Sequence, residues 1–175
     1  DLTDIDKLND KISVYIEIDK SNYHVANVLA MGIYDGKTAY YVKPGQIPDV
    51  MSKISNKEIY TYDLKKHYVT LKKLGIDLDN VTFDSMIAAY LLNYNVKDDI
   101  AYLANQFGFD IPFYEIISKA KEVSEQTIKD LVVKKAKFIY DTRNQLMEDL
   151  AKNNELDLFQ KIEMPLSRVL ADMEL

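Results

Sequence analysis

Hydrophobic residues in the first third of the chain follow the pattern of β-strands. Short runs rich in β-branched and aromatic side chains are separated by turn residues, which favours extended backbone. The predicted strands cover residues 12–18, 24–34, 38–42 and 58–62, with a further extended stretch at 81–83. Asp35 and Gly36 supply a hairpin turn between the second and third strands, because glycine readily adopts positive φ.

Beyond residue 60 the apolar positions recur every three or four residues, which predicts helices. Leu64, Tyr68 and Leu71 share one helical face, and Gly75 is a suitable helix stop. A proline near the middle of the last helix predicts a break there. The predicted helices cover residues 49–54, 64–74, 84–92, 98–107, 124–150 and 156–173.

This order of elements predicts an α/β domain, with helices packed on a mixed sheet. The chain has 175 residues, of which 47% are hydrophobic, and a net charge of −6. The acidic balance argues against a domain that grips nucleic acid by bulk charge. The lack of cysteine excludes disulfides and thiolate zinc sites, and together with the lack of a signal-like segment it favours a cytoplasmic location. The apolar runs are far shorter than the ~20 residues that span a bilayer, so no membrane partner is expected.

The common phosphate-binding and nucleophile motifs do not occur in the sequence. The five glycines form neither a phosphate loop nor a dinucleotide fingerprint, and no G-x-S-x-G nucleophile motif occurs. His24 and His67 are the only histidines, which excludes a multi-histidine metal site. The remaining candidate chemistry is phosphoryl transfer through two metals, which needs several convergent carboxylates.

Two segments carry a family resemblance. Residues 161–175, KIEMPLSRVLADMEL, resemble the junction at which bacterial DNA polymerase I passes from its 3′–5′ exonuclease domain into its polymerase domain. Residues 74–93, LGIDLDNVTFDSMIAAYLLN, resemble the stretch after the second exonuclease motif of that family. The resemblance implies a ribonuclease H-like fold, with residues 1–155 as an exonuclease-like domain and 156–175 leading into the polymerase domain.

The resemblance also implies partners and a cofactor. Both ends of the chain look like cuts in a longer protein, so the expected partners are the polymerase domain of the same chain and, through that parent protein, DNA. The parent would act in DNA replication and repair. Its Mg²⁺ would belong to the polymerase domain, and no cofactor is expected in this domain.

In active members of the family, four carboxylates bind the catalytic metals. The resemblance places Ile16, Ile18, His67 and Lys134 at those four positions. Isoleucine offers none of the oxygen donors that Mg²⁺ requires, and a charged lysine has no lone pair. The expectation is therefore an inactive exonuclease-like domain, with no catalytic residue and no metal, which supports the polymerase module.

One alternative is an active exonuclease whose carboxylates are displaced. Its candidate ligands are Glu17, Asp19, Asp63 and Asp130. In the register of the resemblance, Glu17 and Asp19 lie on the opposite strand face from the lost ligands. Asp63 and Asp130 each lie one helical turn from a lost ligand. Structural roles explain these residues better: Asp63 stands where a helix cap is needed, Asp130 can pair with Lys134, and Asp19 can begin a turn.

A second alternative is a binding module that holds single-stranded DNA without cleaving it. Basic residues gather on the long helix, and tyrosines are abundant enough to stack on bases. The residues in question are Lys129, Lys134, Lys135, Lys137, Arg143, Tyr62, Tyr68 and Tyr90.

Overall fold

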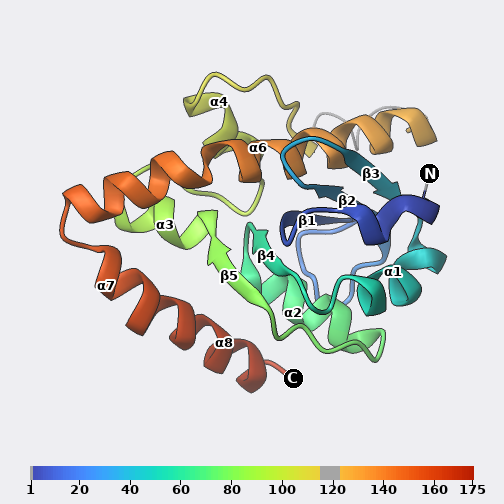
Figure 1. Ribbon diagram of the computed structural model, residues 1–175, viewed down its shortest axis with the longest axis horizontal. Helices are drawn as coiled ribbons and strands as arrows, with labels where there is room; N and C mark the ends of the chain where they lie inside the picture. The colour runs from blue at the N-terminus through green and yellow to red at the C-terminus, as the bar shows by residue number, and fades with distance from the viewer. Residues whose placement is uncertain (1, 115–122) are drawn as a thin grey trace.

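Five strands form one mixed sheet in the computed structural model, which describes residues 2–114 and 123–175 (Figure 1). They are β1 (Lys11–Ile18), β2 (Val28–Tyr34), β3 (Ala39–Val42), β4 (Glu58–Thr61) and β5 (Val81–Asp84). Their order across the sheet is β3-β2-β1-β4-β5. β1 pairs antiparallel with β2 and β2 with β3, whereas β1 with β4 and β4 with β5 pair in parallel. The mixed sheet predicted from the sequence is therefore confirmed.

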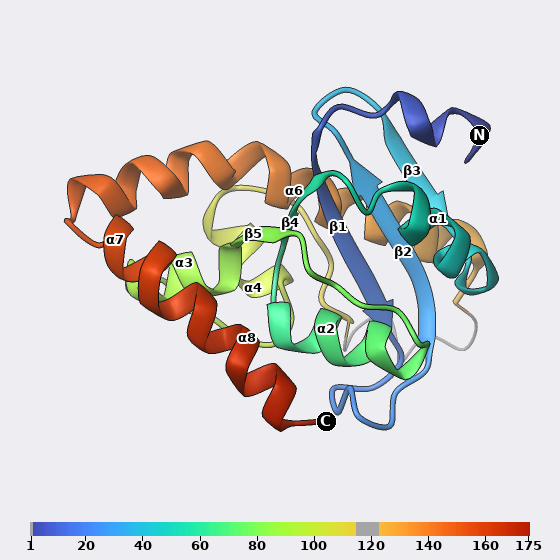
Figure 2. The same ribbon diagram turned by 60° about the horizontal axis from the view of Figure 1, so that its bottom comes forward.

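Helices pack on both sides of this sheet. They are α1 (Ile47–Lys53), α2 (Leu64–Lys73), α3 (Ser85–Leu91), α4 (Ala101–Gln106), α6 (Glu125–Lys152), α7 (Leu156–Leu158) and α8 (Met164–Met173), with the short 3₁₀ segments η1 (Leu2–Lys7) and η2 (Pro44–Gln46) and a π segment η3 (Phe159–Glu163). The long helix α6 crosses one face, and α1 and α2 cover the other (Figures 1 and 2). α8 packs against α2. Within the described residues, no helix is long and apolar enough to cross a membrane.

The contact between α6 and the sheet is very close. A Cβ atom on Gly32 of β2 would lie 2.4 Å from the carbonyl oxygen of Val132 in α6, so only glycine fits there. On the neighbouring strand, the Ser13 hydroxyl donates to the carbonyl oxygen of Ala136 at 2.5 Å. These two contacts fix α6 over β1 and β2. Every residue of β1 except Lys11 is buried, so a charged side chain on this strand needs a partner inside the protein.

The starts of α4 and β2 differ most from the prediction. α4 begins at Ala101 rather than at residue 98. β2 begins at Val28 rather than at residue 24, because Asp19 and Asn27 pair through backbone and side chain and end the ladder there. Residues 20–26 instead form the connection between β1 and β2. The last helix is interrupted as expected: η3 precedes α8, and Pro165 lies in the first turn of α8, where its missing N–H costs no hydrogen bond.

Candidate functional site

A cleft of about 760 Å³ opens at the carboxyl end of β1. Its walls come from β1, the β1–β2 connection, the first turn of α2, α3, α4 with its flanking segments, α6, η3 and α8. Charged side chains of both signs line it. They are Glu17, Asp19, Asp63, Asp84, Asp98, Asp99 and Glu163, with Lys20, Lys65, Lys66 and Lys135. Whether these carboxylates can bind a metal depends on the partners that they already have within the chain.

The central feature of the cleft is a buried ion pair between β1 and α6. The ammonium of Lys135 lies 2.6 Å from the carboxylate of Glu17, and the two side chains are 1% and 5% exposed. The same ammonium lies 5.0 Å from the ring centroid of Tyr15. In a buried site this pairing is required, because either charge alone would be left without solvation. The Glu17 carboxylate is thus already occupied by a cation that belongs to the chain.

This arrangement differs from the expected one at two places. Glu17 lines the cleft together with Ile18, whereas Ile16 is fully buried in the core. A bulge between Glu17 and Ile18 interrupts the alternation of faces expected of a regular strand. On α6 the side chain in the cleft is Lys135, and Lys134 is exposed to solvent. The lysine that lines the cleft therefore follows Lys134 by one residue along the helix.

A second lysine lies beside the same tyrosine. The ammonium of Lys66 is 2.9 Å from the Tyr15 hydroxyl and 4.0 Å from its ring centroid. Burial lowers the pKa of Lys66 to about 8, although the carboxylates of Glu17 and Asp63 act in the opposite direction. Burial also raises the pKa of Tyr15 well above its usual value, so its hydroxyl stays protonated. The floor of the cleft therefore carries two amines around one neutral tyrosine.

His67 lies behind the cleft and does not line it. Its Nε2 accepts a hydrogen bond of 2.9 Å from the backbone N–H of Ile16, and its Nδ1 lies 2.9 Å from the carbonyl oxygen of Asp63. A carbonyl can only accept, so the ring is neutral with its proton on Nδ1. Burial, reinforced by the charge of Lys66, lowers its pKa to about 3. His67 therefore connects α2 to β1 and has no free nitrogen for a metal.

Asp63 and Asp84 are occupied by backbone N–H groups. Asp63 caps α2, with its side chain accepting from the N–H of Lys66 at 3.2 Å. Asp84 caps α3 by accepting from Met86, and it also accepts from the N–H groups of Asp63 and Leu64. Desolvation raises the pKa of Asp84 to about 6, with the negative charge of Asp63 adding to the effect. Both carboxylates shape the cleft wall through their caps.

Of the other two proposed ligands, Asp19 lines the cleft and Asp130 does not. Asp19 lines the cleft edge, where its carboxylate accepts 2.8 Å and 3.1 Å hydrogen bonds from Asn27. Burial acts to raise its pKa, but the bonds from Asn27 outweigh it and lower that pKa. Asp130 is exposed on α6 and accepts from Gln126. Among residues 2–114 and 123–175, no three histidine or acidic side chains are grouped to hold a metal ion.

The tyrosines proposed to stack on bases differ in their exposure. Tyr90 lines the cleft and is 71% exposed. Tyr62 and Tyr68 are buried, and their hydroxyls donate to the carbonyl of Lys97 and to Asp172. Among the tyrosines proposed to stack on bases, only Tyr90 is therefore available.

Comparison with known proteins agrees with this fold. Residues 14–142 match the family model described as DNA polymerase I, ribonuclease H-like domain. This chain belongs to that family. It is 32% identical to DNA polymerase I of Bacillus subtilis (strain 168) over 164 residues, which cover 87% of this chain and 19% of that protein. It thus spans about a fifth of the curated relatives it matches.

Solved structures show the same architecture at lower identity. The chain superimposes on the POL domain of Pol1 from M. smegmatis, in a complex with DNA primer-template and dNTP, with a TM-score of 0.76 and 19% identity, covering 99% of this chain and 30% of that one. Escherichia coli RNase D, an exoribonuclease, gives a TM-score of 0.71 at 12% identity, covering 97% of this chain and 46% of that one. These likenesses confirm the expected ribonuclease H-like fold.

Proposed function

We propose that this domain is a catalytically silent exonuclease-like domain that supports the polymerase module of a DNA polymerase I. The observation that carries the proposal is the buried pair of Lys135 and Glu17. A metal-dependent exonuclease needs several free carboxylates around its metal ions. Here the most central carboxylate is held by an internal ammonium.

The remaining groups support the same interpretation. Lys66 and Lys135 bring two amines to the floor of the cleft, and their positive charge repels a divalent cation. Asp63 and Asp84 accept backbone N–H groups at two helix starts, so turning them toward a metal would uncap α2 and α3. Metal binding would therefore have to disrupt the fold that forms the cleft.

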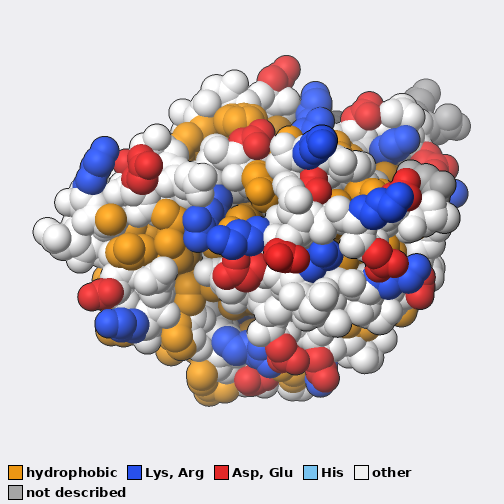
Figure 3. Space-filling view, viewed as in Figure 1, with side chains coloured by type: hydrophobic (Ala, Val, Ile, Leu, Met, Phe, Trp, Pro, Cys, Tyr) orange, Lys and Arg blue, Asp and Glu red, His pale blue; other side chains and the backbone are white. Residues whose placement is uncertain are grey.

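The exposed face of η3 and α8 supports the role as a scaffold. Its hydrophobic side chains point away from the domain and are 39% to 77% exposed. They are Ile162, Leu166, Val169, Leu170 and Met173, and Figure 3 shows hydrophobic side chains gathered over the region of α3, α7 and α8. We propose that the polymerase part of a longer chain covers this face, with the boundary near residue 156. The Mg²⁺ and DNA of the polymerase reaction would be bound by that part.

A nuclease assay tests catalytic silence. The chain is incubated with 5′-labelled single-stranded DNA in Mn²⁺ and Mg²⁺, beside its Glu17→Gln variant. Neither protein is expected to shorten the DNA from its 3′ end. Degradation by the wild-type chain that disappears in the Glu17→Gln variant would contradict the proposal and establish displaced catalytic carboxylates.

The displaced-carboxylate alternative rests on one observation: Glu17, Asp19 and Asp63 do line a single cleft. It predicts that millimolar Mn²⁺ raises the melting temperature, because a ligand that binds the folded state stabilises it. The silent domain predicts an unchanged melting temperature. The DNA-binding alternative rests on Tyr90 and predicts salt-sensitive binding of single-stranded DNA that weakens in Tyr90→Ala.

A further inference from the structure

The end of α8 and the β1–β2 connection meet at one carboxylate. The Tyr23 hydroxyl donates to Oε2 of Glu174, and Nε2 of His24 lies 3.6 Å from the same oxygen. Nζ of Lys65, in the first turn of α2, lies 3.6 Å from Oε1 of Glu174. The rings of Tyr23 and His24 stack at 4.8 Å, so the two residues approach Glu174 as a unit. Figure 2 shows the connection beside the C-terminal end of α8.

The connection is fixed at its base and loosely held elsewhere. At the base, Asp19 and Asn27 exchange backbone and side-chain hydrogen bonds of 2.8 to 3.1 Å. Between them, residues 20–25 are exposed except for the half-buried Tyr23, and so have little apolar packing. Lys73 of α2 donates to the carbonyl oxygens of Tyr23 and Ala26. Apart from the ring of Tyr23, which packs against the core, the tip is held by polar contacts, and such a segment can open locally at the tip.

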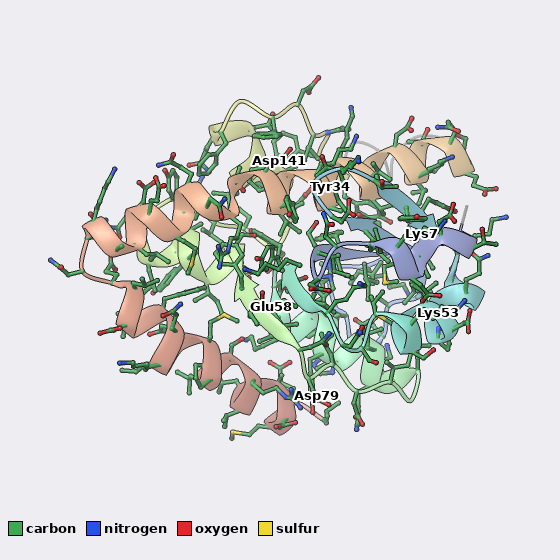
Figure 4. All side chains as sticks on the ribbon, viewed as in Figure 1. Lys7, Tyr34, Lys53, Glu58, Asp79 and Asp141 are labelled. Carbon is green, nitrogen blue, oxygen red and sulfur yellow. The ribbon has the colours of Figure 1, made fainter. Side chains whose placement is uncertain are left out.

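Part of the connection lines the cleft, through Lys20, Ser21 and Tyr23. Glu163 and Ser167, from η3 and α8, form another part of its wall. Glu174 therefore joins the tip of the connection to the helix that forms that wall. α8 itself is held independently, because Arg168 donates to the carbonyl of Leu78 and to Asp79 (labelled in Figure 4). Release of Glu174 would free the side chains of Tyr23 and His24, at the tip of the connection, while α8 stays in place.

We propose that residues 20–25 form a lid over the Tyr23 side of the cleft and that Glu174 is the latch that holds this lid in place. The inference does not depend on whether the cleft is catalytically silent. It states that access to the cleft is controlled from the end of α8, through one carboxylate shared by Tyr23, His24 and Lys65. Any displacement of the last turn of α8 would thereby open the cleft.

The absence of cysteine makes the latch easy to test, because one introduced thiol is then the only one in the protein. Ser167→Cys places this reporter in the cleft, where the serine is only 8% exposed. Its rate of alkylation by iodoacetamide is measured at one pH in three backgrounds: wild type, Glu174→Ala and Asp157→Ala. Asp157 is the matched control, because its exposed carboxylate pairs with Lys161 far from the lid. Circular dichroism and the melting curve confirm that each variant is folded.

The latch predicts that Glu174→Ala raises the alkylation rate about tenfold, as expected when an equilibrium loses one hydrogen bond to a charged group. Tyr23→Phe, which removes only the hydroxyl, is expected to raise the rate by a smaller factor. Asp157→Ala should leave the rate unchanged. Equal rates in the wild-type, Glu174→Ala and Tyr23→Phe backgrounds would overturn the proposal, and so would an equal increase in the Asp157→Ala control. The nuclease assay is independent of either result.

Discussion

The imidazole Nε2 of His67 accepts a hydrogen bond of 2.9 Å from the backbone N–H of Ile16, and so joins α2 to the central strand β1. The bond exists only while the ring is neutral, because a protonated imidazole has no acceptor. The ring is fully enclosed, and its pKa is lowered to about 3. The link between the two elements therefore depends on pH.

We expect the stability that depends on His67 to fall as the pH drops. The unfolded imidazole has a pKa near 6.5, so below that pH the unfolded state binds a proton that the folded state does not. Between pH 7 and pH 5 this lowers the free energy of unfolding by about 2 kcal/mol, with further loss toward pH 3. Urea unfolding at pH 7 and pH 5 gives the change in the free energy of unfolding for the wild-type chain and for His67→Gln. The difference between these two changes measures the contribution of His67.

The comparison with His67→Gln is needed because Asp84 acts in the opposite direction. The folded pKa of Asp84 is raised to about 6, so its carboxyl takes up a proton before the unfolded one does and adds stability as the pH falls from 6 toward 4. This contribution is the same in both proteins and cancels in their difference. Parallel pH dependences in the wild type and His67→Gln would show that His67 is not the acid-sensitive group.

Removing the partner of Glu17 should be costly. Lys135→Met leaves a carboxylate that is buried without a counter-charge, and we expect a loss of about 3 to 5 kcal/mol in the free energy of unfolding. The double variant Lys135→Met/Glu17→Gln should regain most of that loss, because the uncompensated charge is gone. Denaturant unfolding of the two single variants and the double variant completes the cycle. Additive losses would mean that the two residues do not interact.

Asp84 should stabilise the starts of both α2 and α3. Asp84→Ala removes both carboxylate oxygens and leaves three backbone N–H donors without their acceptor, so at pH 7 we expect a loss of about 2 kcal/mol. Asp110→Ala removes the same side chain from an exposed position and is expected to change stability by less than about 0.5 kcal/mol. Denaturant midpoints of the two variants, measured side by side, decide the comparison.

The sequence predicts the strands and helices well because their apolar periodicity is local. The hairpin at Gly36, the cap at Asp63 and the break before α8 all depend on residues close in sequence, and the structure has them at the predicted positions. The family is likewise indicated by two continuous segments, 74–93 and 161–175. Local patterns along the chain are therefore enough to predict both the fold class and the family.

The arrangement of the cleft cannot be predicted in the same way. β1 is buried on both faces, so its run of apolar residues does not reveal which face holds Glu17. On α6, Lys134 and Lys135 follow each other, and only the contact with β1 decides which of the two is buried. Lys66 escapes prediction for the same reason, since it follows Lys65 on α2. A charged residue in a wholly buried strand is the one signal that points to Glu17.

The close approach of α6 to β2 gives the last prediction. A methyl group at Gly32 would lie 2.4 Å from the Val132 carbonyl oxygen, which is backbone and cannot turn away. Gly32→Ala must therefore lift α6 from the sheet, and with it the helix that carries Lys135. We expect a loss of about 1 to 3 kcal/mol in the free energy of unfolding.

Gly45→Ala is the matched control, because a Cβ there meets no atom within 4 Å, and it should change stability by less than about 0.5 kcal/mol. Hydrogen exchange adds a local readout. In Gly32→Ala the amides of α6 should exchange faster than those of α2, because only the α6 contact is strained. Equal stability of the two glycine variants would show that α6 has room to shift, and that the buried ion pair does not depend on this close contact.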